Sequence, residues 1–206
     1  MKNRTKNLLL LFLIFFTSVT VHAQVGRTSS NDTIKLKSTV PFDEEFAKLA
    51  LSEGKSTIKG RVSLTLPPAD GAKTFYGSNL IVYLFPVTPY LLDFLELRKQ
   101  EDPKRLKFAF LSPTSWKYRL EATSNGQGEF AFYHMKPGKY YLEVYFPWQY
   151  TGSDNKYVGS EGNTDYYEKE YFSNKYEQML SKMVEIKKDG ATEKAKLHKF
   201  VVGRRR

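Results

Sequence analysis

The feature of this sequence that most constrains its fold is a two-residue alternation of apolar and polar side chains, interrupted by turn residues. The alternation is clearest in residues 129–135 and 139–145, which are separated by Pro137 and Gly138. A period of two puts the apolar side chains on one face of a strand, and a Pro-Gly pair is typical of a tight turn. The sequence therefore predicts two half-buried strands joined as a β-hairpin.

Four further segments are predicted to be strands. Residues 56–66 alternate in the same way, and residues 79–85 are apolar on both faces, as in an interior strand. Residues 183–187 and 192–202 flank a turn at Asp189-Gly190 and are predicted to form a closing hairpin. Because strand follows strand without regular intervening helices, we predict an all-β fold. It is an antiparallel β-sandwich with prealbumin- or immunoglobulin-like Greek-key order.

Two segments have helical spacing instead. Residues 41–51 carry Phe42, Phe46 and Leu49 on one face, which we expect to lie against the main body, and Gly54 is a candidate cap. Residues 90–100 carry an apolar stripe of the same period, whereas residues 105–111 and 115–122 look extended. The two short helices are expected to decorate the sandwich.

The first 23 residues have the pattern of a cleaved secretory signal peptide. Basic residues precede an unbroken apolar run over 8–16, and small residues stand at Val21 and Ala23 before the expected cleavage point. The alternative is an uncleaved anchor helix, but the apolar run is short for a bilayer span. The sequence therefore predicts export to the periplasm, the cell surface or the medium, with no transmembrane segment after cleavage.

The remaining chain is predicted to form one domain. Residues 24–55 are a polar leader with the short helix, residues 56–202 are the sandwich, and residues 203–206 are a basic tail. Two insertions interrupt the sandwich, at about 87–122 and 147–180. The length of 206 residues calls for no second domain.

Composition argues against enzymatic chemistry. The chain has no cysteine and three histidines, which excludes disulfides, thiolate nucleophiles and cysteine zinc sites. It has no Gly-x-Ser-x-Gly elbow in a strand–turn–helix context, and His134 and His198 each stand at positions typical of surface histidines. We therefore expect a non-catalytic protein without a cofactor, with an enzyme as the least favoured class.

One polar segment carries oxygen-bearing side chains that could bind a calcium ion. Its carboxylate and amide side chains are Asp154, Asn155, Glu161, Asn163, Asp165 and Glu168. The segment lacks EF-hand spacing because Lys156 and Val158 fall at ligand positions counted from Asp154. Polar surface loops commonly have this composition without a metal. No metal site is predicted, and calcium binding is left open.

The strand pattern resembles the carboxypeptidase regulatory-like domains, which are relatives of the transthyretin-like and collagen-adhesin B-type β-sandwiches. The resemblance rests on a first strand bearing Gly60, the apolar segment 79–85, Gly-x-Phe-x-Phe at 128–132 and Pro-Gly-x-Tyr-x-Leu-x-Val at 137–144. It covers about 56–202, with longer insertions than usual in the family. The resemblance implies a β-sandwich and says little about activity.

Two chemically active relatives fit the residues poorly. Isopeptide-forming adhesin domains need a lysine on the first strand, a buried acid and an asparagine or aspartate on the last strand. Lys59 and Glu143 are the candidates here, but Lys59 falls on the polar face and the last strand supplies no asparagine. The hydroxyisourate hydrolases need several histidines and a Tyr-Arg-Gly-Ser end, whereas this chain ends in three arginines.

The most unusual segment is the Tyr-rich stretch within 147–180, which is predicted to be a long loop. Exposed aromatic side chains give rigid contact area at low entropic cost and favour binding of sugars, peptides or proteins. The alternative is that half of them pin the loop to the sandwich. The candidate ligand-binding residues, most of them predicted to be exposed near one another, are Trp148, Tyr150, Tyr157, Tyr166, Tyr167 and Tyr171. The nearby polar candidates are Asp154, Asn155 and Asn163.

The net charge of +10 suggests partners as well. Basic residues concentrate in 87–122 and at the C-terminus. Nucleic acid is disfavoured because the chain is expected to be exported and no nucleic-acid-binding fold is recognised. Anionic envelope polymers or lipid head groups fit better, and a solvated charged face is the plain alternative. We therefore expect an interaction or accessory module at a bacterial cell envelope, binding an envelope protein or polysaccharide. The alternative is a carbohydrate-binding module that uses the 147–180 loop.

Overall fold

The computed structural model describes residues 32–66 and 72–201. The predicted signal peptide (1–23), the start of the leader (24–31) and the basic tail (203–206) lie outside the described residues. The residues from Ile34 onward belong to one compact unit. None of the helices described is both long enough and apolar enough to cross a bilayer.

The described chain is mostly strand. In chain order its elements are β1 (Ile34–Leu36), α2 (Glu44–Ala50), β2 (Ser56–Leu66), β3 (Lys73–Tyr76), β4 (Ile81–Pro86), α3 (Pro89–Arg98), η1 (Pro103–Arg105), β5 (Lys107–Ala109), α4 (Pro113–Lys117), β6 (Leu120–Thr123), β7 (Glu129–Met135), β8 (Gly138–Glu161), β9 (Thr164–Ile186) and β10 (Thr192–Phe200).

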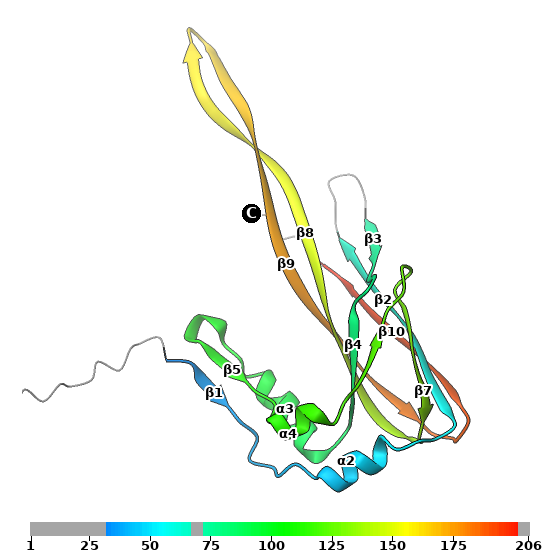
Figure 1. The fold of residues 1–206 in the computed structure, drawn as a ribbon. Helices are drawn as coiled ribbons and strands as arrows, with labels where there is room; N and C mark the ends of the chain where they lie inside the picture. Colours follow the sequence, from blue (N-terminus) through cyan, green and yellow to red (C-terminus); the bar gives the residue numbers. More distant parts are fainter. Residues whose placement is uncertain (1–31, 67–71, 202–206) are drawn as a thin grey trace, which may run out of the picture. The chain divides into compact units, whose positions relative to one another are not determined.

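The ten strands of the described residues form two four-stranded sheets and one small pair (Figure 1). In the first sheet β2 lies between β10 on one side and β7 and β3 on the other. The second sheet has the order β6-β4-β8-β9, and all of its pairs are antiparallel. The predicted all-β sandwich is confirmed, with one parallel pair in it, β10 with β2.

The core lies between the two sheets. β2 contributes Ile58, Val62 and Leu64, and the facing strand β4 contributes Val82 and Leu84. The alternating apolar side chains of the predicted half-buried strands 129–135 and 139–145 are buried here as well: Phe130, Phe132, Tyr140, Leu142 and Val144. Removing this apolar surface from water is the main force that holds the sheets together.

Both predicted hairpins are wrong in their pairing. β7 pairs with β2, whereas β8 pairs with β4 and β9, so the turn at Pro137 and Gly138 carries the chain from one sheet to the other. β9 and β10 also belong to different sheets. The alternation shows which face of a strand is buried, but strands on opposite sides of one core have the same pattern as strands side by side.

The prediction that residues 147–180 form a loop is also wrong. β8 and β9 are 24 and 23 residues long and pair antiparallel from Gly138 with Ile186 to Glu161 with Thr164. β4 pairs only with residues 140–144 of β8, so farther out β8 and β9 form a twisted two-stranded ribbon (Figure 1). Beyond Trp148 both faces of the ribbon are in solvent, and therefore no apolar alternation marks the outer parts of its strands.

In the 87–122 insertion the predicted helix is confirmed, and one segment predicted to be extended is wrong. The helix expected over 90–100 is α3. The segment expected to be extended over 115–122 begins instead as α4, because Ser112 caps this helix and Pro113 stands in its first turn. β5, inside the extended segment 105–111, pairs in parallel with β1, a strand in the predicted leader.

The short helix of the leader is confirmed, but its packing is not as expected. Asp43 caps α2, whose one buried residue is Ala47, while Phe46 and Leu49 are 48% and 64% exposed. The cap at its end is Leu51 and not the expected Gly54.

Candidate functional site

Four aromatic side chains occupy one face of the ribbon where it leaves the sandwich. Trp148 lies directly opposite Tyr176 and stacks on it, with ring centroids 4.6 Å apart and an interplanar angle of 22°. The rings of Tyr150 and Phe172 follow on the same face, 6.0 Å apart. We call Trp148, Tyr150, Phe172 and Tyr176 the aromatic strip.

The aromatic strip continues the core outward. Phe146, two residues before Trp148, is buried in the core, and Trp148 itself packs against it while remaining partly accessible. Tyr150 and Tyr176 are 47% and 46% exposed. One end of the strip is thus fixed by the sandwich, and the other presents its rings to solvent.

Polar and small residues complete the surface of the strip. Asn174 lies opposite Tyr150, so an amide stands among the rings. Phe172 lies over Gly152, where a Cβ would come within 2.6 Å of the ring. The glycine therefore allows the ring to lie flat across the partner strand. Neither Phe172 nor Tyr176 was among the ligand-binding residues predicted from sequence, because only the register places them beside Trp148 and Tyr150.

The other predicted binding residues lie elsewhere on the ribbon. Tyr157 pairs with Tyr167 near the tip, with ring centroids 5.8 Å apart, on the face opposite the strip. Tyr171 lies on that face too, and Tyr166 lies opposite Gly159, beyond a bulge. All four are exposed, as predicted. However, Trp148 and Tyr157 are about 30 Å apart along β8, so the six residues do not form one cluster.

The polar residues predicted to lie beside the binding aromatics are also divided between the two faces and the tip of the ribbon. Asp154 lies on the face of the strip, opposite Glu170, whereas Asn155 lies on the other face, opposite Lys169. Asn163 is in the turn at the tip. In residues 32–66 and 72–201 no group of three or more histidine, aspartate and glutamate side chains is placed to hold a metal ion.

Neither His134 nor His198 lies in an arrangement typical of a catalytic acid or base. His198 Nδ1 lies 3.0 Å from the Ser63 hydroxyl on the solvent face of the first sheet. His134 Nδ1 lies 3.8 Å from a carboxylate oxygen of Glu53, and both side chains are largely exposed. Neither arrangement includes a second group that would orient the imidazole toward a nucleophile.

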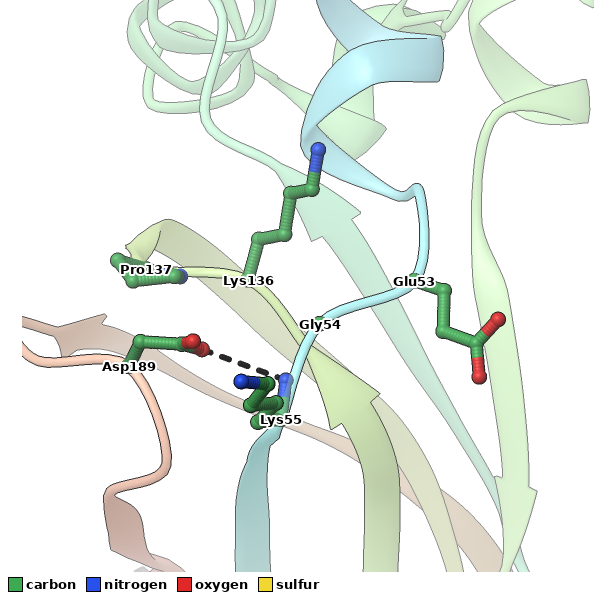
Figure 2. A pocket seen from close by; sticks show the side chains of 6 residues that line it. All are labelled: Glu53, Gly54, Lys55, Lys136, Pro137 and Asp189. Atoms are coloured by element: carbon green, nitrogen blue, oxygen red, sulfur yellow. Dashed lines mark hydrogen bonds between the residues drawn. The ribbon is translucent and has the colours of Figure 1, made fainter.

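A hollow of about 650 Å³ lies beside the turn between β7 and β8. The backbone N–H of Lys55 donates to Asp189 Oδ1 at 3.3 Å. Figure 2 shows the carboxylate of Glu53 and the amine of Lys136 pointing away from each other and from Asp189. The charged groups of this hollow do not converge on a common point, so it offers no site.

A largely buried ion pair lies between α3 and the second sheet. Glu143, 3% exposed, forms an ion pair with Arg98, whose guanidinium also lies 4.6 Å above the ring of Phe94. Burial opposes the charge of Arg98, but the hydrogen bond and charge of Glu143 outweigh it and raise the pKa of Arg98. Burial, together with Glu143, also raises the pKa of Tyr145. The pair joins α3 to the second sheet. Lys59 lies on the solvent face of the first sheet, away from Glu143, so these two residues are not placed to take part in one isopeptide crosslink.

Comparisons with known proteins support the fold. No family model and no curated protein matches this sequence. Among solved structures, the chain is similar to the crystal structure of a "putative carbohydrate binding protein" from Pseudomonas aeruginosa. The TM-score is 0.55 and the identity 23%, over 78% of this chain and 99% of the other. At this identity the similarity shows the β-sandwich fold alone.

Proposed function

We propose that this chain is an exported, non-catalytic carbohydrate-binding protein of a bacterial cell envelope, and that a glycan lies along the aromatic strip. The observation that carries the proposal is the strip itself, a preformed row of accessible rings with the Asn174 amide among them. Flat aromatic rings offer an apolar surface to the apolar face of a sugar. An amide beside them can both donate and accept hydrogen bonds with sugar hydroxyls.

Three further observations support parts of this proposal. The pattern of residues 1–23 supports export, and the absence of cysteine together with the scattered histidines favours a binding protein over an enzyme. The similar structure from Pseudomonas aeruginosa is described as a "putative carbohydrate binding protein", which favours a glycan over other ligands. The strand motifs favour membership of the carboxypeptidase regulatory-like family.

The test is a glycan array followed by affinity measurements on ring-deletion variants. Tyr150→Ala and Tyr176→Ala each remove an exposed ring of the strip, and Tyr171→Ala removes an exposed ring from the opposite face as the matched control. We expect a neutral glycan hit to bind about tenfold more weakly to the two strip variants, which corresponds to about 1.4 kcal/mol. Equal affinity for the wild type and both strip variants would exclude the strip as the binding surface.

A protein partner is the second candidate, and the free edges of the ribbon favour it. β9 pairs only with β8 in the described structure, so its outer edge offers unpaired backbone groups along 23 residues. An exposed strand edge can accept an added strand from another protein. A blank glycan array, with an envelope protein captured by the full chain and not by a chain lacking the ribbon, would favour this candidate.

A further inference from the structure

Four cations stand side by side on the solvent face of the first sheet. Lys59 and Arg61 come from β2, and Lys194 and Lys196 come from β10. The parallel register places Lys59 directly opposite Lys194 and Arg61 directly opposite Lys196. Like charges directly opposite each other destabilise a sheet, whereas opposite charges at the same positions would stabilise it. A face that only had to remain soluble would not need this arrangement.

The two carboxylates on the same face as these cations, Glu121 and Glu129, are already engaged. Glu129 forms an ion pair with Arg61 and accepts a hydrogen bond from the Asn125 amide at 3.2 Å, and these contacts lower the pKa of Glu129. Glu121 lies 2.6 Å from Arg119. Lys59, Lys194 and Lys196 therefore have no anionic partner among the described side chains.

The same face is hollowed. A shallow groove of about 1130 Å³ runs across β10, β2 and β7 to β6. All four cations line it, together with the two carboxylates that are already paired with arginines, Glu121 and Glu129. Ala131 lies opposite Lys59, and its small side chain leaves the middle of the face open. Tyr133, which is 60% exposed, and the polar Thr123 and Asn125 line it as well. We call this the lysine groove.

We propose that the lysine groove binds an anionic polysaccharide, a sugar chain that carries carboxylate or sulfate groups. The cations are spaced about 6.7 Å along a strand and about 4.8 Å between strands, so they present a closely spaced row of charge. Such a row complements a polymer with repeated negative charges. The exposed lysines supply flexible point charges, and Tyr133 and the polar side chains supply stacking and hydrogen bonds for the sugar rings.

This inference goes beyond the function proposed above and does not depend on it. The aromatic strip belongs to the ribbon of the second sheet, whereas the lysine groove belongs to the solvent face of the first sheet and to the edge strand β6. A neutral glycan would use the rings of the strip, and an anionic one would use the charges of the groove.

The test reverses the charge of β10. In the double variant Lys194→Glu/Lys196→Glu, each new carboxylate faces a cation of β2, so the fold is retained and its melting temperature rises. The control Lys104→Glu/Lys117→Glu makes the same change of net charge at exposed lysines of the 87–122 insertion. The probes are polygalacturonate (carboxylated) and heparin (sulfated), with dextran as the neutral polymer.

We expect the wild type, the control and a Tyr150→Ala/Tyr176→Ala variant to bind at least one anionic probe, with affinity that falls as salt rises. The β10 variant should bind that probe at least tenfold more weakly. Equal weakening in the control would overturn the proposal, since net charge alone would then explain binding. Tighter binding to duplex DNA or to phosphatidylglycerol vesicles than to either polysaccharide would overturn it too. Loss of dextran or neutral-glycan binding in the Tyr150→Ala/Tyr176→Ala variant would support the function proposed for the aromatic strip, and it would not change the result for the lysine groove.

Discussion

At the scale of single residues, Gly60 shows how one position of β2 depends on a neighbouring strand. A Cβ at this position would lie 2.2 Å from Cζ of the Phe130 ring and 2.6 Å from the carbonyl oxygen of Ala195. The aromatic ring that marks β7 thus occupies the space that a side chain on β2 would need. This contact gives a physical reason for the glycine in the first-strand motif.

Gly60→Ala should therefore destabilise the fold by about 1–3 kcal/mol, the usual cost of overpacking. Replacing Phe130 as well, by Leu, should not restore stability, because the Ala195 carbonyl still blocks the Cβ. Urea unfolding of the two variants measures both effects. An unfolding midpoint for Gly60→Ala equal to that of the wild type would show that the strands can separate at no cost.

Three tyrosines near the start of β8 predict a loss of stability in alkali; Tyr140 and Tyr141 are buried, and Tyr145 is 38% exposed. Desolvation raises the pKa of all three above the ordinary value of 10.0, and at Tyr145 the neighbouring Glu143 adds to the effect. Below pH 10 these phenols are neutral in the folded and the unfolded chain, so stability is complete. Above that value the unfolded chain loses their protons first, and the fold is progressively destabilised.

Tyrosinate absorbance and circular dichroism, followed together from neutral pH upward, test this. Part of the tyrosinate signal should appear only as the fold is lost, and Tyr145→Phe should reduce the steepness of the alkaline destabilisation. Titration of every tyrosine before any loss of secondary structure would contradict the expected effect of burial.

At the scale of elements, sequence reasoning succeeded where one face of a strand is buried and the other is not. The bounds of β2 and β7 agree with the predicted 56–66 and 129–135 because their side chains alternate between core and solvent. The outer parts of β8 and β9 carry no such contrast, so their Gly, Asn and Tyr content suggested a loop. Two residues of the aromatic strip, Trp148 and Tyr150, were chosen from composition. Their cross-strand neighbours depend on register, which a strand that is polar on both faces specifies only weakly.

The ribbon should be dispensable for folding. Gln149 lies opposite Lys175, and no residue between them belongs to the buried core. Replacing residues 150–174 by Asn-Gly, a favoured two-residue hairpin turn, should leave a folded sandwich with a melting temperature close to that of the wild type. Thermal unfolding measures this, and the same variant should lose neutral-glycan binding while keeping binding in the lysine groove. Failure of the shortened chain to fold would assign the ribbon a structural role.

At the scale of the whole molecule, the second sheet is covered on both faces. One face of β4 and β8 packs into the sandwich core, while Phe85 and Tyr141 point to the other side and pack with Leu91 and Phe94 of α3. This explains why residues 79–85 are apolar on both faces, as predicted for an interior strand. The buried ion pair of Arg98 and Glu143 lies at the same interface, so it couples the insertion to the sandwich.

The two tryptophans allow this coupling to be measured. Trp116, in α4, packs against Tyr83 and Phe85, whereas Trp148 packs against the main core. Chains with Trp116→Phe or Trp148→Phe each keep one fluorescent reporter, and in both the unfolding transition should have the same midpoint.

Arg98→Met should lower the free energy of unfolding by about 3–5 kcal/mol, because it leaves Glu143 buried without its partner. The unfolding transition reported by Trp116 should then precede the one reported by Trp148. Arg98→Met/Glu143→Leu should recover most of the stability, because an apolar pair avoids the desolvation of two charges. If the two transitions stay coincident in Arg98→Met, or are already separate in the parent chains, the ion pair does not join the insertion to the sandwich.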